Sequence, residues 1–330
     1  MSKNILILGA SGFIGTSVVQ ELTGREYTIH CFVRETSDLT YLKRINSKLE
    51  YHFGDILNRE TLIAPMKKCS IIINCTGLNS FWERKNKRYN DINIQGTGNI
   101  MEIALAMKVE KIVHISTVMA YGFPDKMPFN ENSEPGPHMS HYAKTKYLGD
   151  LYALKLYKEK QLPLVCVYLA AVLGRGDSKD VMKIGMFLSN KVKIMLRSEN
   201  RFTYVYNKDA AQAIVKAAEK ANNIGEKYLI GNQRLTTREY MELIGDLSGI
   251  PVPKKTIGKK ATMFLAYINS LASKISKKPP LLPVDLMKTQ FRGSLLFDAS
   301  KSEKELGMKY TPIKVALKDE IDFIRENIGK

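Results

Sequence analysis

The chain is poor in cysteine and has no long hydrophobic run. Only four cysteines occur among 330 residues, and no two of them form a CxxC pair. All four lie in or beside apolar, strand-like segments: Cys31, Cys69, Cys75 and Cys166. This placement predicts buried, reduced thiols rather than disulfide bonds or a metal site. The run of about 18 apolar residues that a transmembrane helix requires is also missing.

No leader-like segment precedes the first apolar run. The polar residues 1–4 lead directly into Ile5–Leu8, which leaves no room for the charged and hydrophobic regions of a signal peptide. We therefore expect a cytoplasmic protein.

Acidic residues are scarce relative to basic ones. The 33 Asp and Glu residues face 50 Lys and Arg residues, which gives a formal net charge of +17 at pH 7. Such an excess occurs in proteins that bind nucleic acids or anionic membranes. The basic residues are spread along the chain, however, and no aromatic–basic module of a nucleic-acid-binding kind occurs. We expect a solvated basic surface and no nucleic-acid partner, with peripheral contact at a membrane surface as the alternative.

Short apolar segments alternate with amphipathic ones over the first 175 residues. The predicted strands are 4–8, 28–33, 50–53, 70–75, 111–116 and 164–169. The predicted helices are 13–23, 59–67, 91–107 and 141–159. This alternation predicts an α/β fold of Rossmann type, a doubly wound parallel sheet with helices on both faces. We expect residues 1–175 to form a dinucleotide-binding domain.

The pattern becomes irregular after residue 175. Helices are predicted at 179–190, 209–221, 236–248, 261–275 and 313–327, and strands at 192–195, 203–206 and 227–230. No long polar linker separates the halves. We expect residues 176–330 to form mostly a smaller, C-terminal substrate-binding lobe, with some segments returning to the Rossmann sheet.

A glycine-rich turn follows the first predicted strand. Gly9 allows a tight turn, Gly12 lets the backbone approach a diphosphate, and Gly15 lets the following helix pack closely on the sheet. The turn predicts a dinucleotide pyrophosphate site, with an ordinary strand–helix turn as the alternative. Its predicted cofactor-binding residues are Gly9, Ser11, Gly12, Phe13, Ile14 and Gly15.

The end of the second strand bears on the choice between NADP and NAD. An acidic residue there would accept a hydrogen bond from the ribose and favour NAD. This chain has Arg34 instead, and a guanidinium suits the 2′-phosphate of NADP. Glu35 keeps NAD open, because a shift of one residue would bring its carboxylate to the ribose. We predict NADP as the cofactor.

Two further strand ends are predicted to contact the cofactor. Asp55, beside Ile56, follows the third strand and is placed to accept from the adenine amine, although an ordinary turn aspartate explains it too. Cys75, Thr76 and Gly77 follow the fourth strand, where small residues let a cofactor cross the sheet edge.

A tyrosine–lysine pair carries the predicted chemistry. Tyr142 stands four residues before Lys146, so both side chains lie on one face of a helix. A phenol titrates near pH 10, and an adjacent ammonium favours the phenolate and lowers its pKa. Lys146 is also placed to hold the nicotinamide ribose. Thr117 would meet the substrate oxygen, and Asn93 would support a proton-relay water.

Motifs along nearly the whole chain resemble the extended short-chain dehydrogenase/reductase family. They are Gly9–Gly15, Gly54-Asp55, Asn93-x-x-Gly96-Thr97, Ser116-Thr117, Tyr142-x-x-x-Lys146, Ala170-Ala-Val-Leu-Gly174-x-Gly176-Asp177 and Tyr228-x-Ile-Gly231. Val33-Arg34, Trp82 and the segment 296–307 resemble the branch that holds dihydroflavonol-reductase-like enzymes, 3β-hydroxysteroid dehydrogenases and hopanoid-associated sugar epimerases.

The resemblance implies roles for individual residues. It makes Tyr142 the general acid/base, Lys146 the residue that tunes it, Thr117 the substrate hydroxyl partner and Asn93 the relay. It adds Leu169 and Val172 to the cofactor site, and a homodimer through the helices near 91–107 and 141–159. The chain departs from the family at Tyr168-Leu169, where Arg-Pro is usual, and at Arg175, where Pro is usual.

The expected substrate pocket is apolar. Leu78, Phe81 and Trp82 lie in one loop and Met119–Phe123 in another, a set that suits a ring-shaped or lipid-like carbonyl compound. Trp82, Tyr121 and Arg175 are the predicted substrate residues. Arg175 and Arg201 are the evidence for a different ligand, because either could bind a sugar diphosphate.

Two histidines and one amphipathic segment are expected to have structural roles. His138 and His141 lack acidic or cysteine partners at ligand spacing, so we expect loop histidines and no metal ligand. Residues 259–278 carry an apolar stripe between basic ends, as an interfacial helix does. We expect this stripe to pack on the second lobe.

The sequence therefore predicts an NADP-dependent oxidoreductase that interconverts a carbonyl and an alcohol on a small, largely apolar molecule. A nucleotide-sugar epimerase or dehydratase with retained NAD(P) is the first alternative, because it would use the same catalytic residues. A non-catalytic NAD(P)-sensing protein is the second, and the intact tyrosine–lysine pair argues against it.

Overall fold

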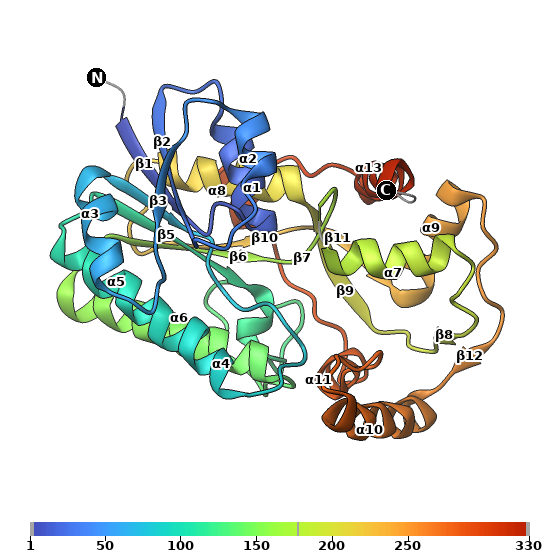
Figure 1. Cartoon of the computed structure of the whole chain (residues 1–330). Helices are drawn as coiled ribbons and strands as arrows, with labels where there is room; N and C mark the ends of the chain where they lie inside the picture. The colour runs from blue at the N-terminus through green and yellow to red at the C-terminus, as the bar shows by residue number, and fades with distance from the viewer. Residues whose placement is uncertain (1–2, 177, 328–330) are drawn as a thin grey trace.

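The computed structural model describes residues 3–176 and 178–327, and its centre is a seven-stranded parallel sheet (Figure 1). The strand order is β10-β6-β5-β4-β1-β2-β3. The bounds are β1 Lys3–Leu8, β2 Tyr27–Val33, β3 Glu50–Phe53, β4 Ile71–Asn74, β5 Lys111–Thr117, β6 Leu164–Leu169 and β10 Lys227–Ile230. This architecture confirms the predicted Rossmann-type α/β fold.

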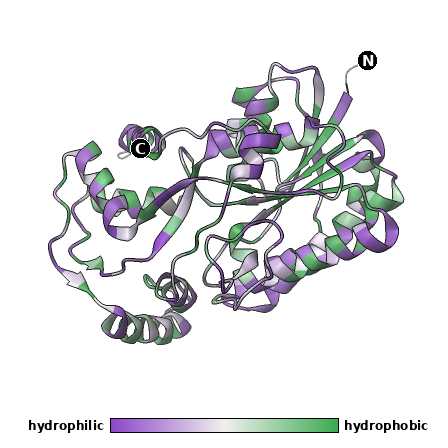
Figure 2. Cartoon of the chain, turned by 180° about the vertical axis from the view of Figure 1, so that it is seen from behind, coloured by the Kyte–Doolittle hydropathy of each residue, from purple (hydrophilic) through white to green (hydrophobic). Residues whose placement is uncertain are grey.

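Helices cover both faces of this sheet (Figure 1). One layer contains α1 (Phe13–Leu22), α2 (Thr40–Ile45) and α8 (Asn207–Glu219), and the other contains α3 (Glu60–Lys68), α5 (Thr97–Ala106) and α6 (His141–Lys160). The central strands are therefore buried on both sides, which is why they read as nearly continuous apolar runs. The hydropathy colours of Figure 2 show the same concentration of hydrophobic residues in the sheet.

Beyond residue 175 the chain contributes to both parts of the molecule. Helix α8 and strand β10 complete the large sheet and its cover. The remaining strands form a three-stranded sheet, β11-β9-β7, and a two-stranded sheet, β12-β8. Their bounds are β7 Ala171–Leu173, β8 Met195–Leu196, β9 Arg201–Tyr206, β11 Gln233–Thr236 and β12 Thr256–Ile257.

The helices of this second lobe form two groups (Figure 1). Helices α7 (Ser178–Leu188), α9 (Thr237–Ser248) and α13 (Ile313–Asn327) pack together around a separate apolar core that includes Phe187, Ile244 and Ile321. Helices α10 (Lys259–Ser276) and α11 (Val284–Gln290) pack on each other at the far end of the lobe. The short α12 (Ser300–Glu305) lies beside β10.

Most long segments match their predicted type, and the differences have physical causes. The predicted helix 91–107 is divided into a π-helical segment η1 (Asp91–Gly96) and α5, and the short α4 (Lys87–Asn90) precedes them. The predicted strand 192–195 shifts to β8 because only Met195 and Leu196 find a partner strand. The short elements α2, β7, β11, α11 and α12 were missed, since elements of three to seven residues carry little periodic signal.

The prediction for the apolar stripe of residues 259–278 was wrong. Only Thr262, Ala266 and Ser273 of α10 are buried, and its large apolar side chains face outward. The buried positions of α10 are thus small residues, and within the described part of the chain the large apolar side chains stay exposed.

The close approach of α1 to the glycine turn generates a stability prediction. A Cβ at Gly15 would lie 2.1 Å from Gly9 O and 2.8 Å from Ala10 Cα, both backbone atoms that cannot move independently. Gly15→Ala should therefore lower the free energy of unfolding by about 1–3 kcal/mol. Gly185→Ala in α7 is the matched control, because nothing lies within 4 Å of its added Cβ and alanine favours the helix by about 0.5–1 kcal/mol. Equal urea midpoints for the two variants would contradict this account.

Candidate active site

The glycine turn between β1 and α1 has the geometry of an anion site. Gly9 has a φ of +77°, and its N–H donates to Phe32 O at 3.1 Å, which ties the turn to β2. Gly12 caps α1 without any side-chain cap, and the first turn of α1 has no acidic residue. The first N–H groups of the helix, at its positive end, therefore suit a diphosphate. Ser11, Phe13 and Ile14 lie in the same turn and are half-buried.

The predicted adenosine contacts lie at the ends of β2 and β3. Arg34 and Glu35 are both exposed, and the Arg34 N–H donates to Ser37 Oγ at 3.1 Å. Arg34 is absent from the ion pairs among the described residues, so its guanidinium stays available. Asp55 Oδ1 accepts from Leu57 N–H at 2.9 Å, the ordinary turn role that the sequence left open. Ile56 is buried below it.

The end of β4 lies directly beside the glycine turn. A Cβ at Gly9 would lie 3.3 Å from the carbonyl carbon of Cys75, so the two turns are in close contact. Thr76 Oγ1 donates to Asn74 Oδ1 at 2.6 Å, and Cys75 is half-buried while the other three cysteines are buried. A Cβ at Gly77 would lie 3.6 Å from Asn93 Oδ1 and 3.8 Å from Lys146 Nζ. Gly77 thus leaves space between these two polar groups.

Helix α6 carries the predicted catalytic pair. Ser140 caps the helix by accepting from Ala143 N–H at 3.1 Å, so the helix begins directly before Tyr142. Tyr142 and Lys146 are 8% and 4% exposed, respectively. Lys146 Nζ donates to Ile115 O at 3.0 Å, its only hydrogen bond to the described residues. An ammonium has three N–H donors, so two remain for ribose hydroxyls.

The structure brings Thr117 and Phe81 to Tyr142. A hydrogen bond joins the Thr117 and Tyr142 side chains, and Thr117 Oγ1 also accepts from Met119 N–H at 3.3 Å. The Phe81 ring meets Tyr142 edge-on, with 6.0 Å between centroids. The hydroxyl pair is therefore bordered by an aromatic wall from the loop after β4.

The expected lowering of the tyrosine pKa was wrong for the protein without cofactor. Burial raises the pKa of Tyr142 to about 12, and the Thr117 hydrogen bond offsets only part of this effect. Burial also lowers the pKa of Lys146, whose ammonium faces Ile115 O. The negative charge of Asp150 adds to the effect of burial and raises the pKa of Tyr142 further.

Asn93 lies in the π-helical segment η1, an irregularity that is frequent at functional sites. Its Oδ1 accepts from Leu78 N–H at 2.8 Å, and its Nδ2 donates to Thr145 Oγ1 at 3.1 Å. Helix α6 packs tightly here, because a Cβ at Gly149 would lie 2.2 Å from Asn93 O. Asn93 therefore joins the loop after β4 to the catalytic helix.

A buried polar network behind the catalytic pair was missed from the sequence. Asp150 Oδ2 accepts from Ser116 Oγ at 2.6 Å, and Asp150 Oδ1 lies 3.0 Å from His114 Nε2. His114 Nδ1 in turn lies 3.0 Å from Asn74 Nδ2. The spacing contained a signal, because Asp150 follows Lys146 by four residues and so shares its helix face. Burial lowers the pKa of His114, so its imidazole is neutral.

Two of the three predicted substrate residues lie away from the catalytic pair or are already engaged. Tyr121 is buried, stacks on Phe129 and donates its hydroxyl to Glu131 O at 3.1 Å. Arg175 donates to Glu326 at 3.0 Å and lies over the Phe323 ring. These contacts do not favour a substrate role for either side chain.

The remaining predicted positions are compatible with the site. Trp82 is half-buried in the loop that contains Phe81. Its backbone N–H donates to Ser80 Oγ at 3.2 Å. Leu169 is buried at the end of β6, and Val172 is half-buried in β7. Asp177 of the family motif lies outside the described residues. His138 Nε2 contacts Ala120 O at 2.8 Å, which is a structural role.

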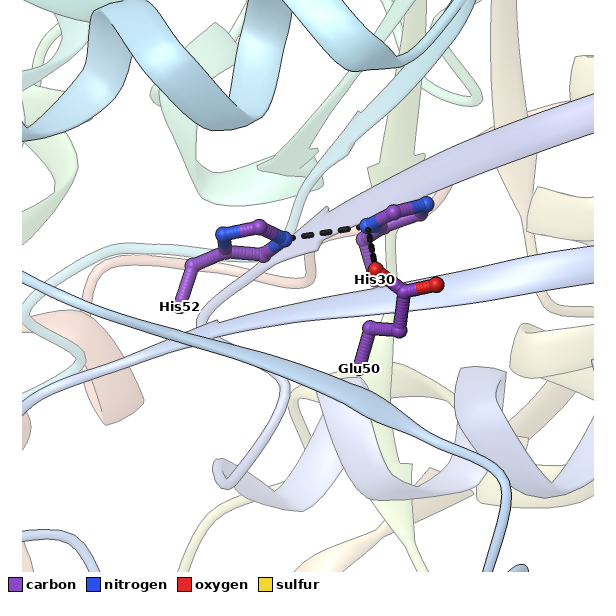
Figure 3. Close-up of side chains that lie close together, drawn as sticks. All are labelled: His30, Glu50 and His52. Carbon is purple, nitrogen blue, oxygen red and sulfur yellow. Dashed lines mark hydrogen bonds and ion pairs between the residues drawn. The ribbon is translucent and has the colours of Figure 1, made fainter.

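A histidine–glutamate cluster that the sequence analysis did not identify lies at the edge of the large sheet (Figure 3). His30 pairs with Glu50 across β2 and β3, and His52 shares their face two residues further on. His30 Nδ1 lies 2.9 Å from His52 Nε2 and 3.3 Å from Glu50 Oε2. One proton on His30 Nδ1 satisfies both contacts without a cation. The positive charge of the nearby Lys68 ammonium disfavours a bound cation at this cluster.

The fold and the site together define an NAD(P)-dependent enzyme of the short-chain dehydrogenase/reductase type. Residues 5–231 match the sequence model of the NAD dependent epimerase/dehydratase family. The chain belongs to this family.

Similar proteins carry names from different reaction classes. A protein named "Putative dihydroflavonol 4-reductase" from Synechocystis sp. is 23% identical, over 99% of this chain and 96% of its own. "Sterol demethylase protein B" of Methylococcus capsulatus is also 23% identical, over 97% and 98% of the two chains. The structure of UDP-glucose 4-epimerase from Thermotoga maritima, determined with UDP-glucose, has a TM-score of 0.79 at 23% identity and covers 98% of this chain and 99% of its own.

The cluster of Figure 3 generates a pH prediction. Burial lowers the pKa of His30 and His52, so the folded protein takes up these protons less readily than the unfolded chain, whose histidines titrate near about 6.5. Their stabilising contribution is complete above this pH and is lost as the pH falls further. His30→Gln should flatten the acid limb of the unfolding free energy measured between about pH 7.5 and 5. Parallel curves for wild type and variant would contradict the assignment.

Proposed function

We propose that the protein is an NADP-dependent oxidoreductase that interconverts a carbonyl and an alcohol on a small, apolar molecule. The observation that carries this proposal is the Thr117–Tyr142 hydroxyl pair beside Lys146, beneath the ring of Phe81. Two hydroxyls in a dry site can hold a single carbonyl or alcohol oxygen, and an aromatic wall selects an apolar body for it.

Each residue has a separate task in this proposal. The nicotinamide supplies or accepts the hydride when it is bound. Thr117 donates a hydrogen bond that orients the substrate oxygen, and the Tyr142 hydroxyl gives that oxygen a proton during reduction or takes it back during oxidation. Lys146 would hold the ribose with its two spare N–H donors. Asp150 keeps Lys146 charged, because its carboxylate opposes the effect of burial on the lysine pKa.

The contacts of two arginines favour an apolar substrate over a nucleotide sugar. Arg201 makes a double contact with the Glu239 carboxylate, at 2.9 and 2.7 Å. Arg175 pairs with Glu326 and lies 3.8 Å from Asp319. A diphosphate would have to replace these carboxylates. The epimerase alternative rests on the family and on the likeness to UDP-glucose 4-epimerase.

We also propose a homodimer through α5 and α6. Leu148 and Leu151 of α6 are 37% and 43% exposed, and a contact through this helix would cover them. Sedimentation of a Leu148→Glu/Leu151→Glu variant tests this, and an unchanged mass would contradict it.

The cofactor preference depends on Arg34. One charge-assisted contact with a 2′-phosphate contributes about 1.5–3 kcal/mol, or roughly 10- to 150-fold in affinity. Wild type should therefore bind NADPH more tightly than NADH, and Arg34→Ala should remove most of the difference in a fluorescence titration. Glu35→Ala is the matched control and should keep the preference for NADPH. Equal binding of both cofactors by wild type would reject the NADP assignment.

The reaction itself is tested by cofactor consumption. Wild type should oxidise NADPH stoichiometrically with hydrophobic aldehydes or ketones. Tyr142→Phe should reduce turnover by about 10²-fold or more while cofactor affinity stays unchanged, because only the proton donor is lost. Tyr147→Phe on the same helix is the control and should keep its activity, since Tyr147 stacks on His138 instead. Interconversion of UDP-sugars without net NADPH oxidation would establish the epimerase alternative.

A further inference from the structure

Helix α10 turns its large apolar side chains to the outside and its small residues to the inside. A helix on a globular domain normally turns its apolar face to the core. The buried positions of α10 are instead the small residues Thr262, Ala266 and Ser273, which are at most 3% exposed. Its exposed apolar side chains are Phe264 (66%), Leu265 (40%), Tyr267 (52%), Ile268 (47%), Leu271 (61%) and Ile275 (86%).

These side chains form one continuous surface. Phe264, Ile268, Leu271 and Ile275 follow one another at intervals of three or four residues, so they lie along one side of the helix. Leu281, 66% exposed, lies five residues beyond the end of the helix. We call these five residues the α10 stripe. Contiguous exposed apolar surface of this kind indicates a contact site.

The charged side chains of the chain segment that carries the stripe are all positive. Residues 247–284 contain seven lysines and no Asp or Glu. The seven, all exposed, are Lys254, Lys255, Lys259, Lys260, Lys274, Lys277 and Lys278. Lysines at both ends of an outward-facing apolar helix are the pattern of a helix that lies in the surface of an anionic bilayer. Among the described residues, no helix is long and apolar enough to cross a membrane.

The same charge disfavours a second copy of this chain as the partner. A two-fold symmetric contact would place one α10 against the other. In an antiparallel pair Lys259 and Lys260 would face Lys274 and Lys277 of the partner, and in a parallel pair each lysine would face its own equivalent. No carboxylate of the segment is present to compensate.

The position of α10 connects its surface to the active site. Helix α10 packs on α11, and Asp285 at the start of α11 accepts a hydrogen bond from the His141 N–H at 3.0 Å. His141 directly precedes Tyr142. Figure 1 shows α10 at the outer end of the second lobe, next to α11.

We propose that the α10 stripe docks the protein peripherally on the surface of an anionic lipid bilayer. The apolar side chains enter the boundary between headgroups and acyl chains, and the flanking lysines contact anionic headgroups.

Flotation of the full-length protein with two kinds of vesicles tests this proposal. One kind is pure phosphatidylcholine, and the other contains about one third phosphatidylglycerol. Wild type should bind the anionic vesicles at least about tenfold more tightly, and this advantage should fall at high salt. Absence of binding to the anionic vesicles, or equal binding to both kinds, would overturn the proposal.

Variants assign the contact to α10. Phe264→Ser/Leu271→Ser/Ile275→Ser should weaken binding to anionic vesicles at least about tenfold, whereas Met182→Ser/Val315→Ser, also at exposed apolar positions, should not. Unchanged thermal unfolding shows that the triple variant is folded. Unchanged vesicle binding by that variant would overturn the proposal. The proposal would also be overturned if light scattering showed that wild type is an oligomer, that the triple variant is a monomer, and that neither protein binds vesicles. Binding is measured without substrate, so failure leaves the proposed reaction untouched.

Discussion

The active site depends on the buried carboxylate of Asp150. Ser116 and His114 on β5 hold this carboxylate, and the helix that carries it also carries Lys146 one turn earlier and Tyr142 two turns earlier. Taking a hydrogen-bond partner from a buried polar group typically costs about 1–3 kcal/mol, and more when the group is charged. Helix α6 therefore cannot slide along the sheet without a large penalty. The position of the phenol relative to Thr117 follows from this constraint.

The sequence predicted what is local and failed where partners are distant. Gly9–Gly15 and the Tyr142/Lys146 pair were recognisable because a turn and a helix face are encoded within a few residues. The link from Asn74 through His114 to Asp150 joins two strands and a helix, and only the folded sheet shows it. The same holds for the cluster of Figure 3, which requires the register of β2 against β3. The contact of Arg175 with Glu326 was likewise not foreseen, because the two residues are far apart along the chain.

The second lobe separates two kinds of surface. Around α7, α9 and α13 most large apolar residues are buried, and Arg175 is paired with the Glu326 carboxylate. Around α10 the apolar residues are exposed and the lysines lack acidic neighbours in sequence. Part of the net charge of +17 therefore comes from a segment without acidic residues. This segment includes α10, which packs on α11, and Asp285 of α11 contacts His141 at the start of α6. The proposed apolar substrate and the proposed lipid surface are consistent, because apolar molecules partition into lipid bilayers.

The central claim is that Tyr142 exchanges the proton, although burial raises its pKa to about 12 in the protein without cofactor. The most direct measurement is the ionisation of Tyr142 followed by NMR of ring-labelled tyrosine, with Tyr142→Phe used to assign the signal. Without cofactor the Tyr142 signal should remain that of a neutral phenol beyond pH 10. With the oxidised cofactor, whose nicotinamide carries a positive charge, ionisation should begin at a clearly lower pH. A pKa near 10 in the free protein, or no change on adding the oxidised cofactor, would contradict the account.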